Sequence, residues 1–218
     1  MDSVLNSQAC GLDPAQGGGW TARVPGSHES DVLHVFIDRD QNASALELNA
    51  EHRFDIGDAR LDECLSLIIA PAPNADAWSD PVELLRAQCV IALDLLSSET
   101  TAVLWAAADS LMGADYFRRM IGIWIDGGAF PALGLAALVK EERGVVRSTG
   151  LDMLVGQDVA VHPAEGLRPA DQARLAMRIM DFLVREGPIQ QEQTVEVDGF
   201  GMVTVQIDPK QGIINLYR

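Results

Sequence analysis

The C-terminal segment from Thr194 to Tyr217 carries the pattern that most constrains the fold. Apolar residues recur at nearly every second position in three runs, which are separated by turn signals at Asp198-Gly199 and at 208–212. This period is typical of strands with one buried face, and Asp-Gly favours a tight hairpin. We therefore predict a terminal β-meander. Because strands left alone expose unpaired backbone groups, we expect these to pair with a central sheet or with a second copy of the chain.

Three segments have the apolar spacing of amphipathic helices. The first follows Ser79-Asp80-Pro81, where a capping aspartate precedes an early proline. The second covers 115–125, and the third begins at Pro169 and ends at Gly187-Pro188. The apolar face of the first is expected to hold Val82, Leu85, Cys89, Ala92, Leu93 and Leu96.

Short apolar or alternating runs predict strands around these helices. They cover 31–38, 44–48, 65–70, 101–107 and 155–162, and 133–148 has the pattern of an antiparallel hairpin with a charged tip.

The predicted fold is α+β, with a mixed, largely antiparallel sheet, two main packing helices and the C-terminal β-meander. Residues 1–29 are rich in Gly, Ser and Pro, so we expect a flexible or irregular N-terminal segment there. No composition break divides the remainder, which favours a single α+β domain over 30–218.

The chain has a net charge of −16, from 32 acidic and 16 basic residues. A phosphate backbone is bound by clustered Lys and Arg, so this balance argues against a nucleic-acid partner. Two interpretations of the acidity stay open. It keeps the protein soluble, or it steers the protein toward a basic protein partner.

The sequence predicts a cytoplasmic protein without a membrane partner. Residues 1–20 lack the basic and apolar regions of a secretory signal, and apolar runs such as 133–139 are shorter than the roughly 20 residues of a transmembrane helix. Cys10, Cys64 and Cys89 are far apart and lack CxxC spacing, which favours reduced thiols. We expect the second and third to pack as small hydrophobic side chains.

The motifs that would assign a catalytic residue, a cofactor or a metal are missing from the sequence. Neither GxxxxGK[ST] nor GxGxxG is present to cradle phosphates, GxSxG is absent, and the four histidines are isolated rather than spaced as zinc ligands. We therefore expect no metal site and no cofactor.

Two turns within the apolar stretch 101–163 are the best candidates for a binding site. One runs from Asp126 to Phe130 and the other from Arg147 to Gly150, and we expect the fold to place them side by side. For the nearby tryptophans, the competing interpretation is that they lie in the core. For the serine and threonine hydroxyls, it is that they bond to backbone groups at a turn or strand end. The candidate binding residues are Trp124, Asp126, Phe130, Arg147, Ser148 and Thr149.

Four stretches of the second half are distinctive: AVLWAAADSLMGADYF, WIDGGAFPALGL, RSTGLDMLVGQDVAV and, after a helix, TVEVDGFGMVTV. Together they resemble an uncharacterised bacterial family, the domain of unknown function 4261. The resemblance covers the second half well and the region from Leu65 loosely. It implies one cytoplasmic α+β fold and carries no catalytic residue to this chain.

Three functional hypotheses follow from the sequence. The leading one is a non-enzymatic, immunity-like or regulatory protein whose acidic surface binds a partner. The alternative is a hydrolase or small-molecule-binding enzyme with a pocket near 124–130 and 147–149. The third is a homo-oligomer that associates through the C-terminal strands.

Overall fold

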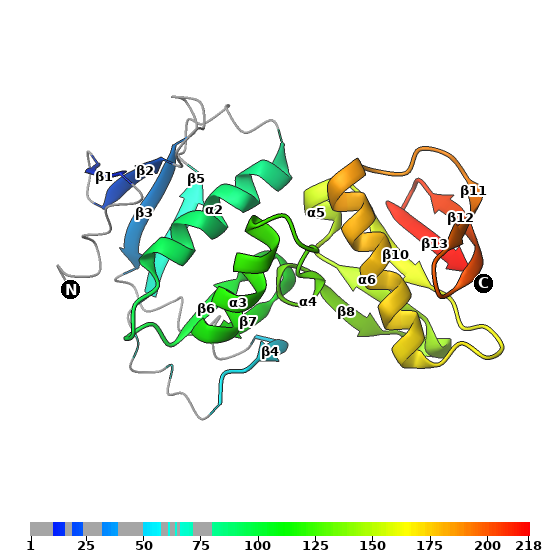
Figure 1. Cartoon of the computed structure of the whole chain (residues 1–218). Coiled ribbons are helices and arrows are strands. Elements are labelled where there is room, and N and C mark those ends of the chain that lie inside the picture. The colour runs from blue at the N-terminus through cyan, green and yellow to red at the C-terminus, as the bar shows by residue number, and fades with distance from the viewer. Residues whose placement is uncertain are drawn as a thin grey trace. The chain divides into compact units, whose positions relative to one another are not determined.

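Figure 1 shows the chain as a computed structural model, which describes residues 11–15, 19–23, 32–38, 50–57, 61, 64, 66–71 and 80–218. The chain forms two compact units. Unit 1 draws on residues 1–104 and 111–128, and unit 2 on residues 105–110 and 129–218. Residues 30–218, for which the sequence favours a single domain, therefore contribute to both units.

The first sheet of unit 1 has four antiparallel strands in the order β1-β2-β3-β5. β3 and β5 confirm the strands predicted at 31–38 and 65–70. β1 and β2 lie within 1–29, so two parts of that segment are regular rather than irregular. The strand predicted at 44–48 lies outside the described residues. The four strands are β1 (Gly11–Pro14), β2 (Trp20–Arg23), β3 (Leu33–Asp38) and β5 (Ser66–Pro71).

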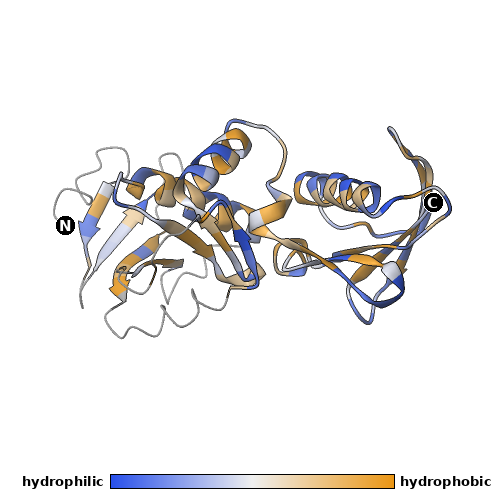
Figure 2. Ribbon diagram, turned by 90° about the horizontal axis from the view of Figure 1, so that it is seen from below, coloured by the Kyte–Doolittle hydropathy of each residue, from blue (hydrophilic) through white to orange (hydrophobic). Residues whose placement is uncertain are grey.

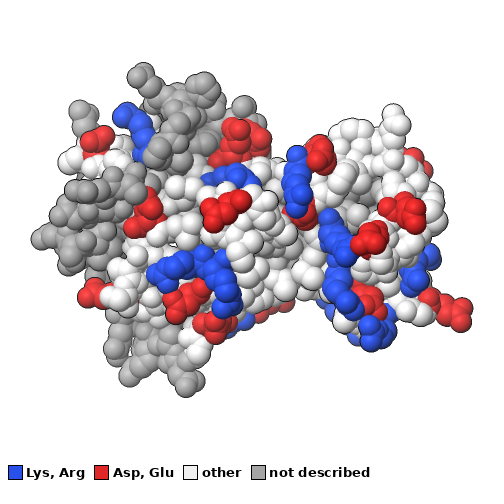
Figure 3. All heavy atoms as spheres, in the orientation of Figure 1, with Lys and Arg blue, Asp and Glu red and all other residues white. Residues whose placement is uncertain are grey.

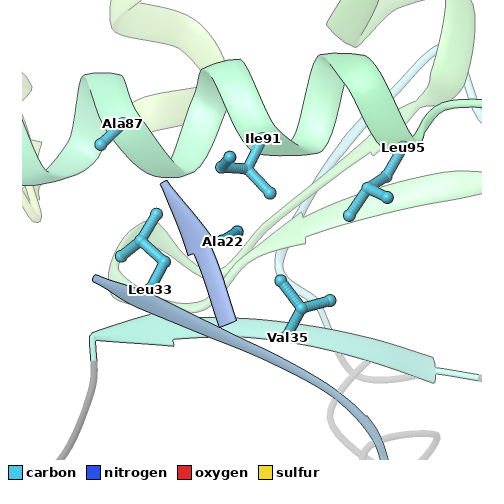
Figure 4. Close-up of a cluster of buried hydrophobic side chains, with 6 residues drawn as sticks. All are labelled: Ala22, Leu33, Val35, Ala87, Ile91 and Leu95. Carbon is cyan, nitrogen blue, oxygen red and sulfur yellow. The ribbon is translucent and has the colours of Figure 1, made fainter. Parts of the chain in front are cut away.

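Helix α2 (Pro81–Leu95) covers this sheet and confirms the first predicted helix. Asp80 caps it, because its Oδ1 accepts a hydrogen bond of 2.8 Å from the N–H of Val82. Burying a side chain the size of leucine stabilises the folded state by about 1.5–3 kcal/mol, so the layer between helix and sheet is a substantial core. The side chains that meet there are Ala22, Leu33, Val35, Ala87, Ile91 and Leu95 (Figure 4).

The second sheet belongs mainly to unit 1 and has the strand order β4-β7-β6. Its strands are β4 (His52–Phe54), β6 (Ala102–Trp105) and β7 (Ser110–Gly113). β6 is shorter than the strand predicted at 101–107, because the chain turns there into the 3-10 segment η2 (Ala106–Ala108). Helix α3 (Ala114–Ile125) begins directly after β7 and confirms the helix predicted at 115–125.

Unit 2 is built on a six-stranded sheet in the order β11-β12-β13-β10-β9-β8. Neighbouring strands are antiparallel except β10 and β13, which are parallel. Both the terminal meander and the hairpin of β8 and β9 are confirmed. The six strands are β8 (Ala137–Lys140), β9 (Val146–Thr149), β10 (Asp158–Val161), β11 (Gln193–Val197), β12 (Gly201–Asp208) and β13 (Ile213–Tyr217).

Helix α6 (Pro169–Glu186) packs on β9 and β10 and confirms the third predicted helix, with Gly187 at its C-cap. Hydrophilic and hydrophobic colours alternate along it in Figure 2, as expected of a helix with one buried face. The residues buried on that face are Gln172, Leu175, Ala176, Ile179, Met180 and Leu183.

Two predicted strands of unit 2 begin later than the sequence indicated. The short helix α5 (Asp152–Val155) replaces the start of the strand expected at 155–162, and Gly156, with φ of 75°, ends that helix. The short segment α4 (Ala132–Leu135), a turn in which Leu133 and Gly134 depart from helical backbone angles, likewise replaces the start of the predicted hairpin. A 3-10 segment, η3 (Glu142–Gly144), forms the hairpin tip.

The predicted α+β class, the largely antiparallel pairing and the C-terminal meander are therefore confirmed, although the strands form three sheets rather than one. α2 and α6 each pack on a different sheet. Within the described ranges, no helix has the length and apolar character needed to cross a membrane.

Candidate functional site

Trp124 and Asp126 belong to unit 1. Trp124 is buried on α3, and the guanidinium of Arg86 lies 4.5 Å from its ring centroid in a cation–π contact. Arg86 also donates a hydrogen bond of 3.4 Å from Nη2 to the backbone oxygen of Trp124. The tryptophan is therefore a core side chain, whereas Asp126 is exposed just after the helix.

Phe130 belongs to unit 2, where its side chain is buried. Its backbone N–H donates a hydrogen bond of 2.7 Å to Oδ1 of Asp181 on α6. The other oxygen of that carboxylate, Oδ2, accepts a hydrogen bond of 2.6 Å from Arg185. These contacts tie the segment before α4 to α6, so they describe a structural anchor.

Arg147, Ser148 and Thr149 lie on β9 in unit 2. The Ser148 hydroxyl is buried and donates a hydrogen bond of 2.7 Å to Oδ1 of Asp158 on β10. It also accepts one of 2.8 Å from the N–H of Val159. This hydroxyl is therefore fully engaged between two strands. Thr149 is half-buried beside it.

Asp158 is the buried acid of this network, with its side chain only 7% exposed. Burial raises the pKa of its carboxyl above the ordinary value, while the hydrogen bond from Ser148 opposes that shift. Arg147 lies 3.9 Å from the carboxylate and 3.4 Å from Glu141 on its other side. The Nε of Arg147 is buried and meets no acceptor among the residues the structure describes.

The chemistry open to this network is limited by access. A serine nucleophile must reach its substrate and must pass its proton to a base that is itself positioned for the reaction. Ser148 has no exposed surface, and its hydroxyl already serves both strands. We therefore interpret Ser148 and Asp158 as a buried polar link between β9 and β10.

A surface hollow of about 240 Å³ lies beside α6 in unit 2. Asp171, Arg174 and Arg178 line it from successive turns of the helix, which places them on one face. The turn between β11 and β12 contributes Gly199 and Phe200, and Arg218 completes the wall. Figure 3 shows basic side chains along α6 with acidic ones among them.

A second, more open hollow of about 270 Å³ lies at the C-terminal end of α6. It is lined by Phe182 and Glu186 from the helix, by residues 187–191 and by Gln193 at the start of β11. Phe182 is 46% exposed, which is unusual for a large aromatic side chain.

Neither hollow is lined by the six residues that the sequence singled out. Trp124 and Asp126 lie in one unit, and Phe130, Arg147, Ser148 and Thr149 lie in the other. The expectation that the two turns lie side by side stays a prediction.

Sequence reasoning missed the arginine-lined hollow because its residues come from three distant segments. The signal available was the spacing of Asp171, Arg174 and Arg178, which fall three and four residues apart on a predicted helix. Nothing in the sequence joined them to Phe200 or Arg218, because that contact depends on how the meander packs.

Among the residues that the structure describes, no cluster of three or more His, Cys, Asp or Glu side chains is arranged to hold a metal ion. Comparison of the chain with protein-family models, with curated proteins and with solved structures gives no match. The resemblance to the domain of unknown function 4261 stays a prediction.

Proposed function

We propose that this chain is a non-enzymatic interaction protein that binds a basic protein partner, and that an extended basic segment of the partner docks along β11. The observation that carries the proposal is the position of β11 at an open edge of the six-stranded sheet. An edge strand presents unpaired backbone groups, to which an extended peptide adds as a further strand.

The charge around β11 specifies the chemistry of the partner. Glu186 lies at the end of α6, Glu192 directly precedes the strand and Glu196 lies on it, and all three are exposed. None of them has an ion-pair partner among the described residues. A segment rich in Lys or Arg would complement this acidic edge, and the net charge of −16 would steer it there.

The second hollow supplies an apolar contact beside the same edge. Phe182 is exposed there, and Gln193 belongs to both the hollow and β11. A partner strand on this edge would therefore place a neighbouring apolar side chain against the aromatic ring. Apolar anchors of this kind supply much of the affinity at protein interfaces, whereas exposed charges mainly set the partner and the rate.

Charge favours a basic partner over a second copy of the chain at this edge. Pairing two copies through β11 would bring two sets of the three glutamates together, and like charges across strands are destabilising. The homo-oligomer through the C-terminal strands therefore stays the less favoured prediction. The enzyme alternative also stays a prediction.

Binding of a peptide of alternating lysine and valine to the full chain tests the proposal by isothermal titration at two salt concentrations. A triple variant, Glu186→Gln, Glu192→Gln and Glu196→Gln, should bind about tenfold more weakly, since exposed ion pairs contribute about 0.2–1 kcal/mol each. The matched control replaces Glu83, Glu99 and Asp126 of unit 1 with their amides, which changes net charge equally.

Hydrogen exchange in the complex adds a local measurement, because an added strand should protect the outward amides of β11. Three results would overturn the proposal. The first is an equal loss of affinity in both triple variants, which would mean non-specific attraction. The second is binding without added protection at β11. The third is a dimer in light scattering together with protection of the β11 amides in the chain without peptide, which would mean that the chain is already paired through this edge.

A further inference from the structure

We propose that the hollow beside α6 lined by Arg174, Arg178 and Arg218 is a binding site for a compact, phosphate-bearing small molecule. This site is independent of the partner proposed for β11. It is a cavity in unit 2 with three arginines in its lining, in a chain where acidic residues outnumber basic ones by 32 to 16.

The charge balance at the hollow is positive. Arg168 does not line the hollow, but it pairs at 2.8 Å with Asp171, which does. The carboxylates at this position are Asp171, which also pairs with Arg174, and Asp198, which lies 3.6 Å from Arg178. Among side chains, the three lining arginines therefore lie around two carboxylates, which leaves a positive side-chain charge at the hollow.

Ionisation of Asp171 does not change over the physiological range. Hydrogen bonding from Arg168 lowers the pKa of its carboxyl, so the group stays charged at neutral pH. The positive balance is thus a fixed property of the site. Carboxylates elsewhere on the acidic surface are largely screened, because the Debye length at physiological salt is about 8 Å.

The contacts that hold Arg178 and Arg218 in place use only some of their N–H donors. Arg218 donates from Nε to the backbone oxygen of Phe200 at 2.9 Å, and Arg178 donates from Nη1 to the backbone oxygen of Asp198. A guanidinium has five N–H donors, and the two Nη groups of Arg218 meet no acceptor among the described residues. Ordered guanidinium groups lose less conformational entropy when a ligand binds.

Phe200 gives one wall an apolar surface. Its ring is buried, and the guanidinium carbon of Arg178 lies 5.5 Å from the ring centroid. The neighbouring Gly199 has no side chain, so the turn leaves the hollow open on that side.

Size and charge together favour a phosphate group. At about 240 Å³ the hollow is smaller than the 300–1,000 Å³ typical of drug-sized ligands, so it suits a compact molecule. The positive side-chain charge suits an anion, and the planar guanidinium groups match phosphoryl oxygens in geometry. A monocarboxylate offers one charge and fewer acceptors.

Titration of the full chain with inorganic pyrophosphate, with glycerol phosphate and with acetate tests this inference. Both phosphate compounds should bind more tightly than acetate, and the tighter of the two identifies the ligand as a diphosphate or as a phosphomonoester. The amide signals of Gly199 and Phe200 should shift in NMR spectra. No binding of either phosphate compound at millimolar concentration would overturn the proposal.

Matched arginine variants separate this site from general attraction of anions. The pair Arg174→Gln and Arg218→Gln should weaken pyrophosphate binding by about tenfold or more, because charge-assisted hydrogen bonds are lost. The control pair, Arg118→Gln and Arg143→Gln, changes net charge equally at exposed positions outside the hollow. Equal weakening by both pairs would overturn the proposal.

A double variant with lysines, Arg174→Lys and Arg218→Lys, keeps the positive charge but removes the planar guanidinium groups that form two hydrogen bonds at once. Its affinity for pyrophosphate should lie between those of the original chain and the glutamine pair. Thermal unfolding of every variant shows whether it is folded. If the glutamine pair is unfolded, the lysine pair decides the question, since affinity equal to that of the original chain would contradict specific recognition by the arginines.

Discussion

Replacing Ser148 with alanine tests whether the buried link between β9 and β10 stabilises unit 2. The substitution removes one hydroxyl from a fully buried position without adding bulk. It deletes two hydrogen bonds at once, the one donated to Asp158 at 2.7 Å and the one accepted from the N–H of Val159 at 2.8 Å. Both former partners then stay buried.

The expected loss is worked from these two bonds. A hydrogen bond to a charged group contributes about 1.5–3 kcal/mol, and leaving a buried N–H without an acceptor costs about 1–3 kcal/mol. Because the two effects share one small cavity and the strands relax, we expect Ser148→Ala to lower the free energy of unfolding by about 3 kcal/mol. The loss should shrink as pH falls, since a protonated Asp158 no longer needs the donor.

Native-state hydrogen exchange gives the most direct assay, because it reports opening free energies strand by strand. A loss of about 3 kcal/mol corresponds to roughly 100-fold faster exchange of the β10 amides. Thr149→Ala is the matched control, since it removes the adjacent, half-buried hydroxyl, which has no hydrogen-bond partner among the described residues. If the two variants exchanged at equal rates, the network would have no stabilising role.

Three further predictions concern pH, backbone geometry and thiol reactivity. Because the pKa of Asp158 is raised above 3.8, the folded state binds more protons just above that value, so stability falls as pH rises through this window. Unfolding measured against pH should show a flatter profile for Asp158→Asn, and an unchanged slope would refute the assignment. Gly150→Ala should destabilise unit 2 by at least about 1 kcal/mol more than Gly156→Ala. Both glycines have positive φ, but only at Gly150 would a Cβ lie 2.7 Å from a backbone oxygen, and equal thermal unfolding would contradict this. Burial raises the pKa of Cys89 to about 12, so iodoacetamide should modify it at pH 8 only after urea unfolds the chain, and rapid labelling of the native protein would show that the thiol is accessible.

The helices and most strands were predictable because their signals are local. Asp80-Pro81 begins α2 and Gly187 ends α6 through contacts with their own backbone, which the sequence displays directly. The alternation after Thr194 likewise identifies the meander, since its period depends only on which face of each strand is buried.

The buried face of α2 was predicted only in part. Leu85 and Cys89 are buried as expected, but Ala92 and Leu93 are half-buried, while Ile91 and Leu95 contribute to the core. Apolar residues occur on most sides of this helix, so helical spacing alone is compatible with more than one buried face. The choice is made by the elements packed on it, the first sheet and α3.

The pairing of strands that are distant in the sequence could not be predicted from local patterns. β13 pairs in parallel with β10, a strand more than 50 residues earlier, and no turn signal encodes that neighbour. The chain passes from unit 1 to unit 2 between Trp124 and Phe130, so the candidate residues are divided between the two units, a division that no local sequence signal marks.

The segment Trp105–Ser110 is built into unit 2 although the residues on both sides of it belong to unit 1. On the ribosome it emerges early, whereas Gly150, which would meet the Ala107 oxygen if it carried a Cβ, emerges much later. At ordinary translation rates this interval is roughly 2 to 9 seconds. During that time Ala108, buried in the finished protein, lacks its later neighbours. Nascent chains arrested in this interval should therefore be good clients for chaperones that bind apolar segments.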